Sequence, residues 1–176
     1  MKKIIIYANG KDRVGIISDI TKEISNLGGN IETSKMIKLD QEFNMLVLIS
    51  IDKQNIDLLE KNLLLHNDDL EIYIKKTLNK KTNLNNEYIF ILKGADTEGI
   101  VHQCTSLFSN LKINIIDLET KIINAPITGA PLFHIKSIIS IPIESSIKNI
   151  QNQMLDLERK SNVKIKFEEY NPNLNQ

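Results

Sequence analysis

The apolar positions change their spacing along the chain, and these changes predict alternating strands and helices. An apolar run at residues 3–8 ends at an Asn-Gly pair, which is typical of a buried strand. Apolar residues three and four positions apart then mark one face of a helix: Ile16, Ile17, Ile20, Ile24 and Leu27. The pair Gly28-Gly29 follows, as glycine commonly does at the end of a helix. The chain is therefore predicted to start with a strand and an amphipathic helix.

The residues that follow extend this start to the order βαββαβ. Apolar runs predict strands at 31–39 and 43–51, joined by a tight turn at Asp40-Gln41. A second amphipathic helix is predicted over 55–66, and alternating apolar and charged residues predict a closing strand at 70–78. The helical positions predicted to face inward are Ile56, Leu59 and Leu63.

The second half of the chain repeats this order of elements. Strands are predicted at 87–93, 114–124, 132–142 and 163–167, and helices at 100–111 and 145–160. The helical positions predicted to be buried are Val101, Cys104, Phe108, Leu111, Ile147, Ile150, Met154 and Leu157. The polar, Asn-rich segment 79–86 is a predicted linker between domains 1–78 and 87–170, and residues 171–176 are a predicted frayed tail.

The motif between the first strand and the first helix occurs twice. Asp12-Arg13-Val14-Gly15-Ile16-Ile17 returns 84 positions later as Asp96-Thr97-Glu98-Gly99-Ile100-Val101. Without a gap, the same offset aligns Asn30 with Asn114. Identities in one register over this length indicate a duplicated domain.

Two βαββαβ units predict an α+β protein with two ferredoxin-like domains in tandem. Each domain is expected to be an antiparallel sheet with both helices on one face. The sheet edges need covering, because an unpaired edge invites association with other chains. The two copies can pair within one chain or between the chains of a homodimer, and the sequence leaves both arrangements open. A homodimer is the expected assembly.

Composition narrows the classes of function. The 22 basic residues balance 22 acidic residues, whereas a protein that binds nucleic acid directly concentrates Lys and Arg. No apolar run approaches the ~20 residues of a membrane helix. The single cysteine, Cys104, forms no internal disulfide and suits a reducing compartment. We therefore expect a cytoplasmic protein without direct contact to nucleic acid or membrane.

No pattern in the sequence indicates catalysis or a cofactor. His66, His102 and His134 lie on different predicted elements and follow no metal-ligand spacing. The sequence contains no phosphate loop, cysteine pair, serine elbow or dinucleotide fingerprint. We expect a non-enzymatic protein with no catalytic residue, no metal and no cofactor.

The duplicated motif resembles the signature of the ACT domain family. The residues concerned are Gly10-x-Asp12-Arg13-x-Gly15 with Gly29-Asn30-Ile31, and their second copy. ACT domains are small sensors, most often of amino acids, that belong to or partner metabolic enzymes and regulators. The resemblance implies two ACT domains that together span nearly the whole chain.

Further segments resemble the glycine cleavage system transcriptional repressor family of tandem ACT proteins. They are Asn30-Ile31-Glu32-x-Ser34, Glu42-Phe43 and Gly129-Ala130-Pro131-Leu132-Phe133. In that family the protein restrains an activator of the glycine cleavage genes, and glycine relieves the restraint. The resemblance implies a regulator that binds a glycine-like amino acid and controls a transcription factor by protein contact. A regulatory subunit of an amino-acid biosynthetic enzyme and a ligand-free interaction module are the alternatives.

The candidate ligand-binding residues are Asp12, Arg13, Gly15, Asn30, Asp96, Gly99 and Asn114. The aspartates and asparagines correspond to positions that contact the amino acid in ligand-binding ACT domains. A glycine before a helix lets a ligand reach the free N–H groups and the positive dipole end, which suit a carboxylate. The aspartate can accept from an α-ammonium group, and the arginine can bind a carboxylate with two hydrogen bonds.

Each candidate also has a purely structural interpretation. The aspartates can cap the helices, the glycines can pack helix against strand, the asparagines can stabilise turns, and the arginine can face solvent. The sequence leaves open whether both copies bind a ligand. If only one does, we expect it to be the first, because the second copy has Thr97 where the first has Arg13. The loop 124–131 has no counterpart in the first copy, and it is either a ligand or partner contact or a tolerated insertion.

Overall fold

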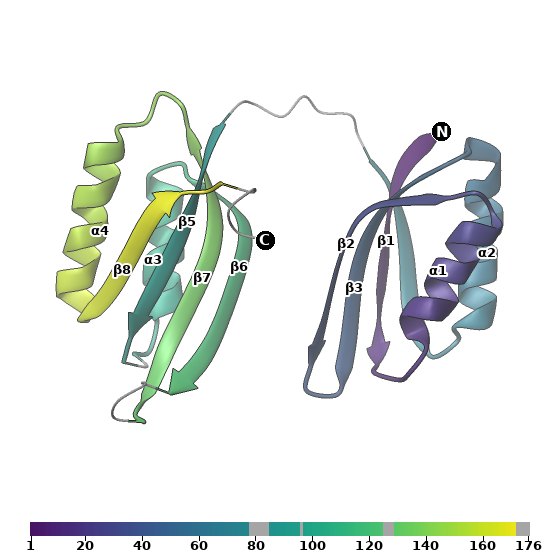
Figure 1. Cartoon of the computed structure of the whole chain (residues 1–176), viewed down its shortest axis with the longest axis horizontal. Helices are drawn as coiled ribbons and strands as arrows, with labels where there is room; N and C mark the ends of the chain where they lie inside the picture. Colours follow the sequence, from purple (N-terminus) through teal and green to yellow (C-terminus); the bar gives the residue numbers. More distant parts are fainter. Residues whose placement is uncertain (78–84, 96, 125–128, 172–176) are drawn as a thin grey trace. The chain divides into compact units, whose positions relative to one another are not determined.

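The computed structural model describes residues 1–77, 85–95, 97–124 and 129–171 (Figure 1). The chain separates into two compact units, residues 1–81 and 82–176. Each unit follows the order βαββαβ and contains one four-stranded antiparallel sheet. The predicted fold class, two ferredoxin-like domains in tandem, is confirmed.

The first unit has its helices on one face of the sheet (Figure 1). Its elements are β1 (Lys2–Lys11), α1 (Ile16–Asn26), β2 (Asn30–Leu39), β3 (Glu42–Ile51), η1 (Lys53–Asn55), α2 (Ile56–His66) and β4 (Leu70–Lys76). The strand order is β2-β3-β1-β4. The predicted turn at Asp40-Gln41 joins β2 to β3, and Asp40 adopts the left-handed conformation with φ 54°.

Alternation along the strands decides which side chains form the core of the first unit. On β3 the buried residues are Phe43, Met45, Val47, Ile49 and Ile51. Ile16, Ile20 and Ile24 of α1 pack against them, as predicted, together with the predicted residues of α2. Ile17 is the exception: it is 38% exposed and lines a pocket instead of the core.

The second unit repeats the architecture, again with both helices on one face of the sheet (Figure 1). Its elements are β5 (Asn85–Gly94), α3 (Ile100–Asn110), β6 (Asn114–Asn124), β7 (Pro131–Pro142), α4 (Ile147–Ser161) and β8 (Val163–Glu169), in the sheet order β6-β7-β5-β8. The rings of Phe90 and Phe108 meet edge to face in its core, with centroids 4.9 Å apart. Cys104 is buried, as predicted, and burial raises the pKa of its thiol to about 12.

Asn9-Gly10, expected to end the first strand, lies within β1. A Cβ on Gly10 would lie 2.8 Å from the backbone oxygen of Asp69, so glycine lets β1 continue beside the start of β4. Gly94 holds the same place in the second unit, where a Cβ would lie 2.5 Å from Val163 Cγ1. These two glycines permit close strand pairing.

β5 begins at Asn85, so Asn85 and Asn86 belong to a strand and not to the expected linker. Residues 79–84 of that linker, 125–128 of the expected loop, 172–176 of the expected tail, and Asp96 lie outside the described residues. Within the part of the chain that the structure describes, no helix is long and apolar enough to cross a membrane.

Candidate functional site

A pocket of about 410 Å³ lies between the end of β1 and the tip of the β2–β3 hairpin. The two segments are brought together because Lys11 pairs with Glu42 and the N–H of Asp12 donates to the oxygen of Gln41 at 2.8 Å. The polar lining residues are Asp12, Arg13, Ser18 and Lys38, and the apolar ones are Val14, Ile16, Ile17, Met36, Ile37 and Phe43, with Gly15 between them. The volume is in the range of small-molecule sites.

Gly15 starts α1 in a conformation that other residues rarely adopt. Its φ is 100°, and as the N-cap residue it offers no side chain to the helix. A Cβ at this position would have its nearest neighbours at 3.8 Å, on Arg13 and Asp19. The interpretation that this glycine packs helix against strand is therefore wrong, since the backbone conformation alone explains it. Because no side chain caps α1, the N–H groups of its first turn remain available beside the pocket.

Asp12 forms an ion pair with Lys38 at the rim of the pocket and does not cap α1. Lys38 Nζ lies 2.6 Å from Asp12 Oδ2, with side-chain exposures of 59% and 30%. Lys38 was not among the sequence candidates. Its position follows from the sheet register: Lys38 on β2 pairs with Phe43 on β3, which pairs with Gly10 near the end of β1, so the long lysine side chain can reach Asp12. The site thus presents an anion and a cation side by side.

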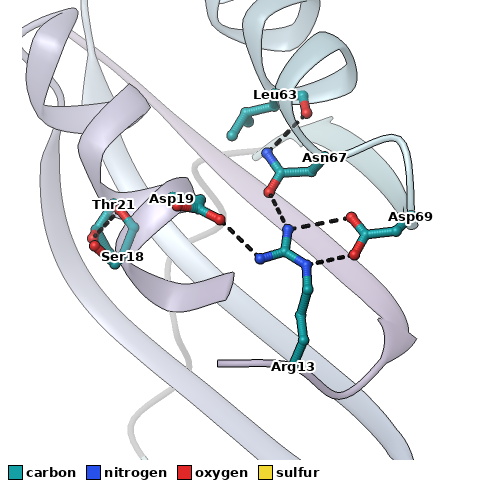
Figure 2. A network of polar contacts seen from close by, with 7 residues as sticks. All are labelled: Arg13, Ser18, Asp19, Thr21, Leu63, Asn67 and Asp69. Atoms are coloured by element: carbon teal, nitrogen blue, oxygen red, sulfur yellow. Dashed lines mark hydrogen bonds and ion pairs between the residues drawn. The ribbon is translucent and has the colours of Figure 1, made fainter. Parts of the chain in front are cut away.

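Arg13 is held by protein side chains and is therefore unlike a free ligand contact (Figure 2). Its Nε and Nη2 donate to the two carboxylate oxygens of Asp69, and its Nη1 donates to Asp19 Oδ2 at 2.9 Å. Asn67, which is buried at the end of α2, accepts from Nη2 at 3.4 Å and donates to the Leu63 oxygen at 3.0 Å. Arg13 therefore ties the β1–α1 loop to the α2–β4 connection and fixes one wall of the pocket.

The Arg13 network shifts the pKa values of Asp69 and of Arg13 itself. The hydrogen bond from Arg13 lowers the pKa of Asp69, and the bonds to Asp69 and then Asp19 raise the pKa of Arg13. A carboxylate whose pKa is lowered in the folded state stabilises that state at pH values above its unfolded pKa. This contribution is lost as the pH falls through the lowered folded pKa of Asp69.

Replacing Arg13 with glutamine is expected to reduce stability modestly at pH 7, because Asp69 and Asp19 lose their cation. The difference in unfolding free energy between the variant and the unchanged protein should shrink once the pH falls below the ordinary aspartate pKa of 3.8. Urea unfolding at pH 7 and at pH 3 measures both values. Arg159→Gln is the matched control, because Arg159 is 78% exposed and reaches Asp156 only at 3.7 Å. A difference that stays constant with pH would contradict the assignment.

Asn30 lies at the opposite end of the sheet from Asp12. It pairs with Ser50, which pairs with Lys3 near the start of β1, whereas Asp12 follows the end of β1. At about 3.3 Å per residue the two ends are roughly 26 Å apart. Within one unit, therefore, the structure does not bring Asp12 and Asn30 together around one small ligand. Asn30 borders a separate depression together with Thr21, Lys22 and Gly29.

The second unit shares the backbone conformation of this site but has neither its lysine nor its arginine. Gly99 again has positive φ, 78°, and starts α3 without a side-chain cap. Ile122 occupies the place of Lys38, because Ile122 pairs with Phe133 as Lys38 pairs with Phe43. Asn114 pairs with Ser140 at the far end of the sheet, as Asn30 does with Ser50.

The geometry of the first unit agrees with comparisons to known proteins. The family model of the ACT domain matches residues 2–77. A UPF0237 protein from Streptococcus pneumoniae is 34% identical over 89 residues, which are 50% of this chain and 92% of that protein. The chain belongs to the ACT domain family. The resemblance inferred from the glycine-bearing motif is thereby confirmed, and the first unit is an ACT domain.

Two longer matches extend over both ACT-like units. The glycine cleavage system transcriptional repressor of Escherichia coli is 29% identical over 151 residues, which are 84% of this chain and 80% of the repressor. A crystal structure of an unknown protein from Galdieria sulphuraria is 28% identical with a TM-score of 0.87, and the match covers 97% of this chain and 99% of that one. The tandem arrangement is therefore shared with both proteins.

Proposed function

We propose that this chain is a regulator whose first ACT domain binds a small amino acid in the pocket beside Asp12 and Lys38. The observation that carries this proposal is the adjacent anion and cation at the uncapped N-terminus of α1. The similarity to the Escherichia coli repressor over most of both chains supports a regulatory role.

The charges at the pocket rim complement those of an amino acid. The α-ammonium group of the ligand would donate a hydrogen bond to the Asp12 carboxylate. The carboxylate of the ligand would bind Lys38 Nζ. The free N–H groups in the first turn of α1 would add donors for the carboxylate. The ion pair between Asp12 and Lys38 would open to admit the ligand, so that each charge exchanges one partner for another.

The apolar walls bear on the size of the ligand. Glycine, the ligand that the repressor resemblance implies, would leave Met36 and Phe43 uncovered. A pocket of about 410 Å³ also has room for a short side chain. We therefore propose a glycine-like amino acid, with glycine, alanine and serine as the first ligands to test.

The surface around the pocket suits contact with a protein. Val14 is fully exposed, Met36 is 58% exposed and Ile37 is 50% exposed, and all three line the pocket. Exposed apolar side chains grouped in this way mark interaction surfaces. We propose that the partner is a transcriptional activator of glycine cleavage genes, and that the ligand acts through its different affinities for the free and bound states.

Heat denaturation in the presence of each of the twenty amino acids tests the proposal. A ligand that binds only the folded state at 100 times its Kd adds about 2.7 kcal/mol to stability, which is a rise of several degrees in Tm. We expect such a rise for at least one small amino acid. No rise with any of the twenty would overturn amino-acid sensing. Copurification with a catalytic subunit, and not with a transcription factor, would favour the alternative of an enzyme's regulatory subunit.

A further inference from the structure

Four basic side chains form one row across the open face of the second unit's sheet, which is the face without helices. In order from β6 to β8 the row consists of Lys121, His134, Lys93 and Lys164. Each is the direct register partner of the next, and register partners point to the same face. Neighbouring strands lie about 4.8 Å apart, so the row is about 14 Å long.

The protein neutralises few of the charges in this row. Like charges directly opposite each other destabilise a sheet. Among the described residues Lys93 and Lys164 have no ion-pair partner, and Lys121 meets only Glu119, at 3.4 Å. His134 Nδ1 is buried without a hydrogen-bond partner. Burial, followed by the charges of Lys93 and Lys121, lowers the pKa of His134.

One end of the row borders a pocket of about 690 Å³. Lys93 and Lys164 line it together with Arg159 from the last turn of α4. Glu158 also lines it, but its Oε1 already accepts from the N–H of Ile165 at 2.6 Å. The pocket therefore offers three cations, and its lining carboxylate is already engaged.

The first unit shows that the fold does not require this arrangement. The corresponding row consists of Ile37, Asn44, Asn9 and Glu71. The residue before β4 in the first unit, Asp69, binds Arg13, whereas the residue before β8 is Asn162, a lining residue of the second pocket. The basic row and its pocket are therefore specific to the second unit.

We propose that the second unit binds a small molecule with two or more phosphate groups along this row, with the phosphates at Lys93, Lys164 and Arg159. The lysine ammonium group is a compact point charge that suits phosphate, and arginine binds phosphate through paired N–H groups. Because the row is about 14 Å long, a single carboxylate can contact only some of its positive charges. Single-stranded nucleic acid is less suitable, because such binding uses stacked aromatic rings. The next row of the open face consists of Glu119, Lys136, Ile91 and Lys166, none of which is aromatic.

Isothermal titration of the intact chain with inorganic triphosphate at low ionic strength tests this proposal. We expect binding that weakens as salt is added. The double variant K93Q/K164Q should lose on the order of 10-fold to 100-fold in affinity, because each lysine supplies a charged hydrogen bond. Both side chains are exposed, so the variant should keep its circular dichroism spectrum. The pKa of His134, measured by NMR, should rise when bound triphosphate offsets the positive charges of Lys93, Lys121 and Lys136. The negative charge of Glu119, which raises this pKa, is unchanged by the ligand.

K75Q/K76Q in the first unit makes the same change in charge and should leave triphosphate binding unaltered. An equal loss in this control, or no binding at low salt, would overturn the proposal. Citrate binding as tightly as triphosphate would refute the preference for phosphate. A single-stranded oligonucleotide binding more tightly per phosphate would refute a small-molecule ligand. These outcomes are independent of the amino-acid site, because that site lies in the other unit.

Discussion

Replacing Gly10 with alanine is expected to lower the free energy of unfolding of the first unit by about 1–3 kcal/mol. The new Cβ would lie 2.8 Å from the backbone oxygen of Asp69 and 2.8 Å from Leu70 Cδ2. Backbone cannot move aside as a flexible side chain can, so β4 must shift. The shift displaces Asp69 and with it the bonds that hold Arg13. Hydrogen exchange resolved for each unit should therefore show faster exchange in the first unit alone.

Gly28→Ala is the matched control for this prediction. Gly28 has φ 69°, and a Cβ added there would meet nothing within 4 Å, so its replacement costs only backbone strain. The Arg13 Nε–H signal in NMR should move in the Gly10 variant and stay in place in the Gly28 variant. Equal effects of the two variants on this signal would contradict the close contact with Asp69.

Replacing Asp12 with asparagine is expected to weaken amino-acid binding by roughly 10-fold to 100-fold. The estimate follows from losing one charged hydrogen bond of about 1.5–3 kcal/mol to the ligand's ammonium group. Lys38→Ile should weaken binding by a similar factor, because it removes the cation that binds the ligand's carboxylate. This substitution installs the residue that the second unit has at the corresponding position, Ile122. Calorimetric titration of each variant with the best ligand of the thermal screen gives the affinities.

Stability separates this effect from misfolding. The Asp12–Lys38 pair is partly exposed, and such pairs contribute about 0–1 kcal/mol, so both variants should unfold close to the unchanged protein. Asp57→Asn removes a carboxylate from the first turn of α2, outside the pocket, and should leave affinity unaltered. Unchanged binding in Asp12→Asn, or an equal loss in Asp57→Asn, would refute the assigned role of Asp12.

The fold could be predicted from the sequence because the spacing of apolar residues within short segments indicates each element, and the same order of elements occurs twice. Spacings of three and four placed Ile16, Ile20 and Ile24 on one face of α1, and the core confirms them. Ile17 has the same local pattern, but it falls at the edge of the covered face and lines the pocket. Periodicity indicates which residues share a helical face, and only packing decides where the core ends.

The site was harder to predict because it depends on pairing between distant segments. Asp69, which binds Arg13, lies 56 positions away in the sequence, and no local pattern links the two. Lys38 reaches Asp12 only through the register of β2 with β3. The Asn30 position was inferred by resemblance, but the strand directions place it at the far end of the sheet.

Calorimetric titration of the intact chain with glycine, alanine and serine decides whether the first ACT domain contains an amino-acid site. We expect saturable binding of one of them at one site per chain, and this binding should be lost or strongly weakened in Asp12→Asn and Lys38→Ile. Binding of none of the three, two equal sites per chain, or binding indifferent to both substitutions would contradict an amino-acid site in the first ACT domain.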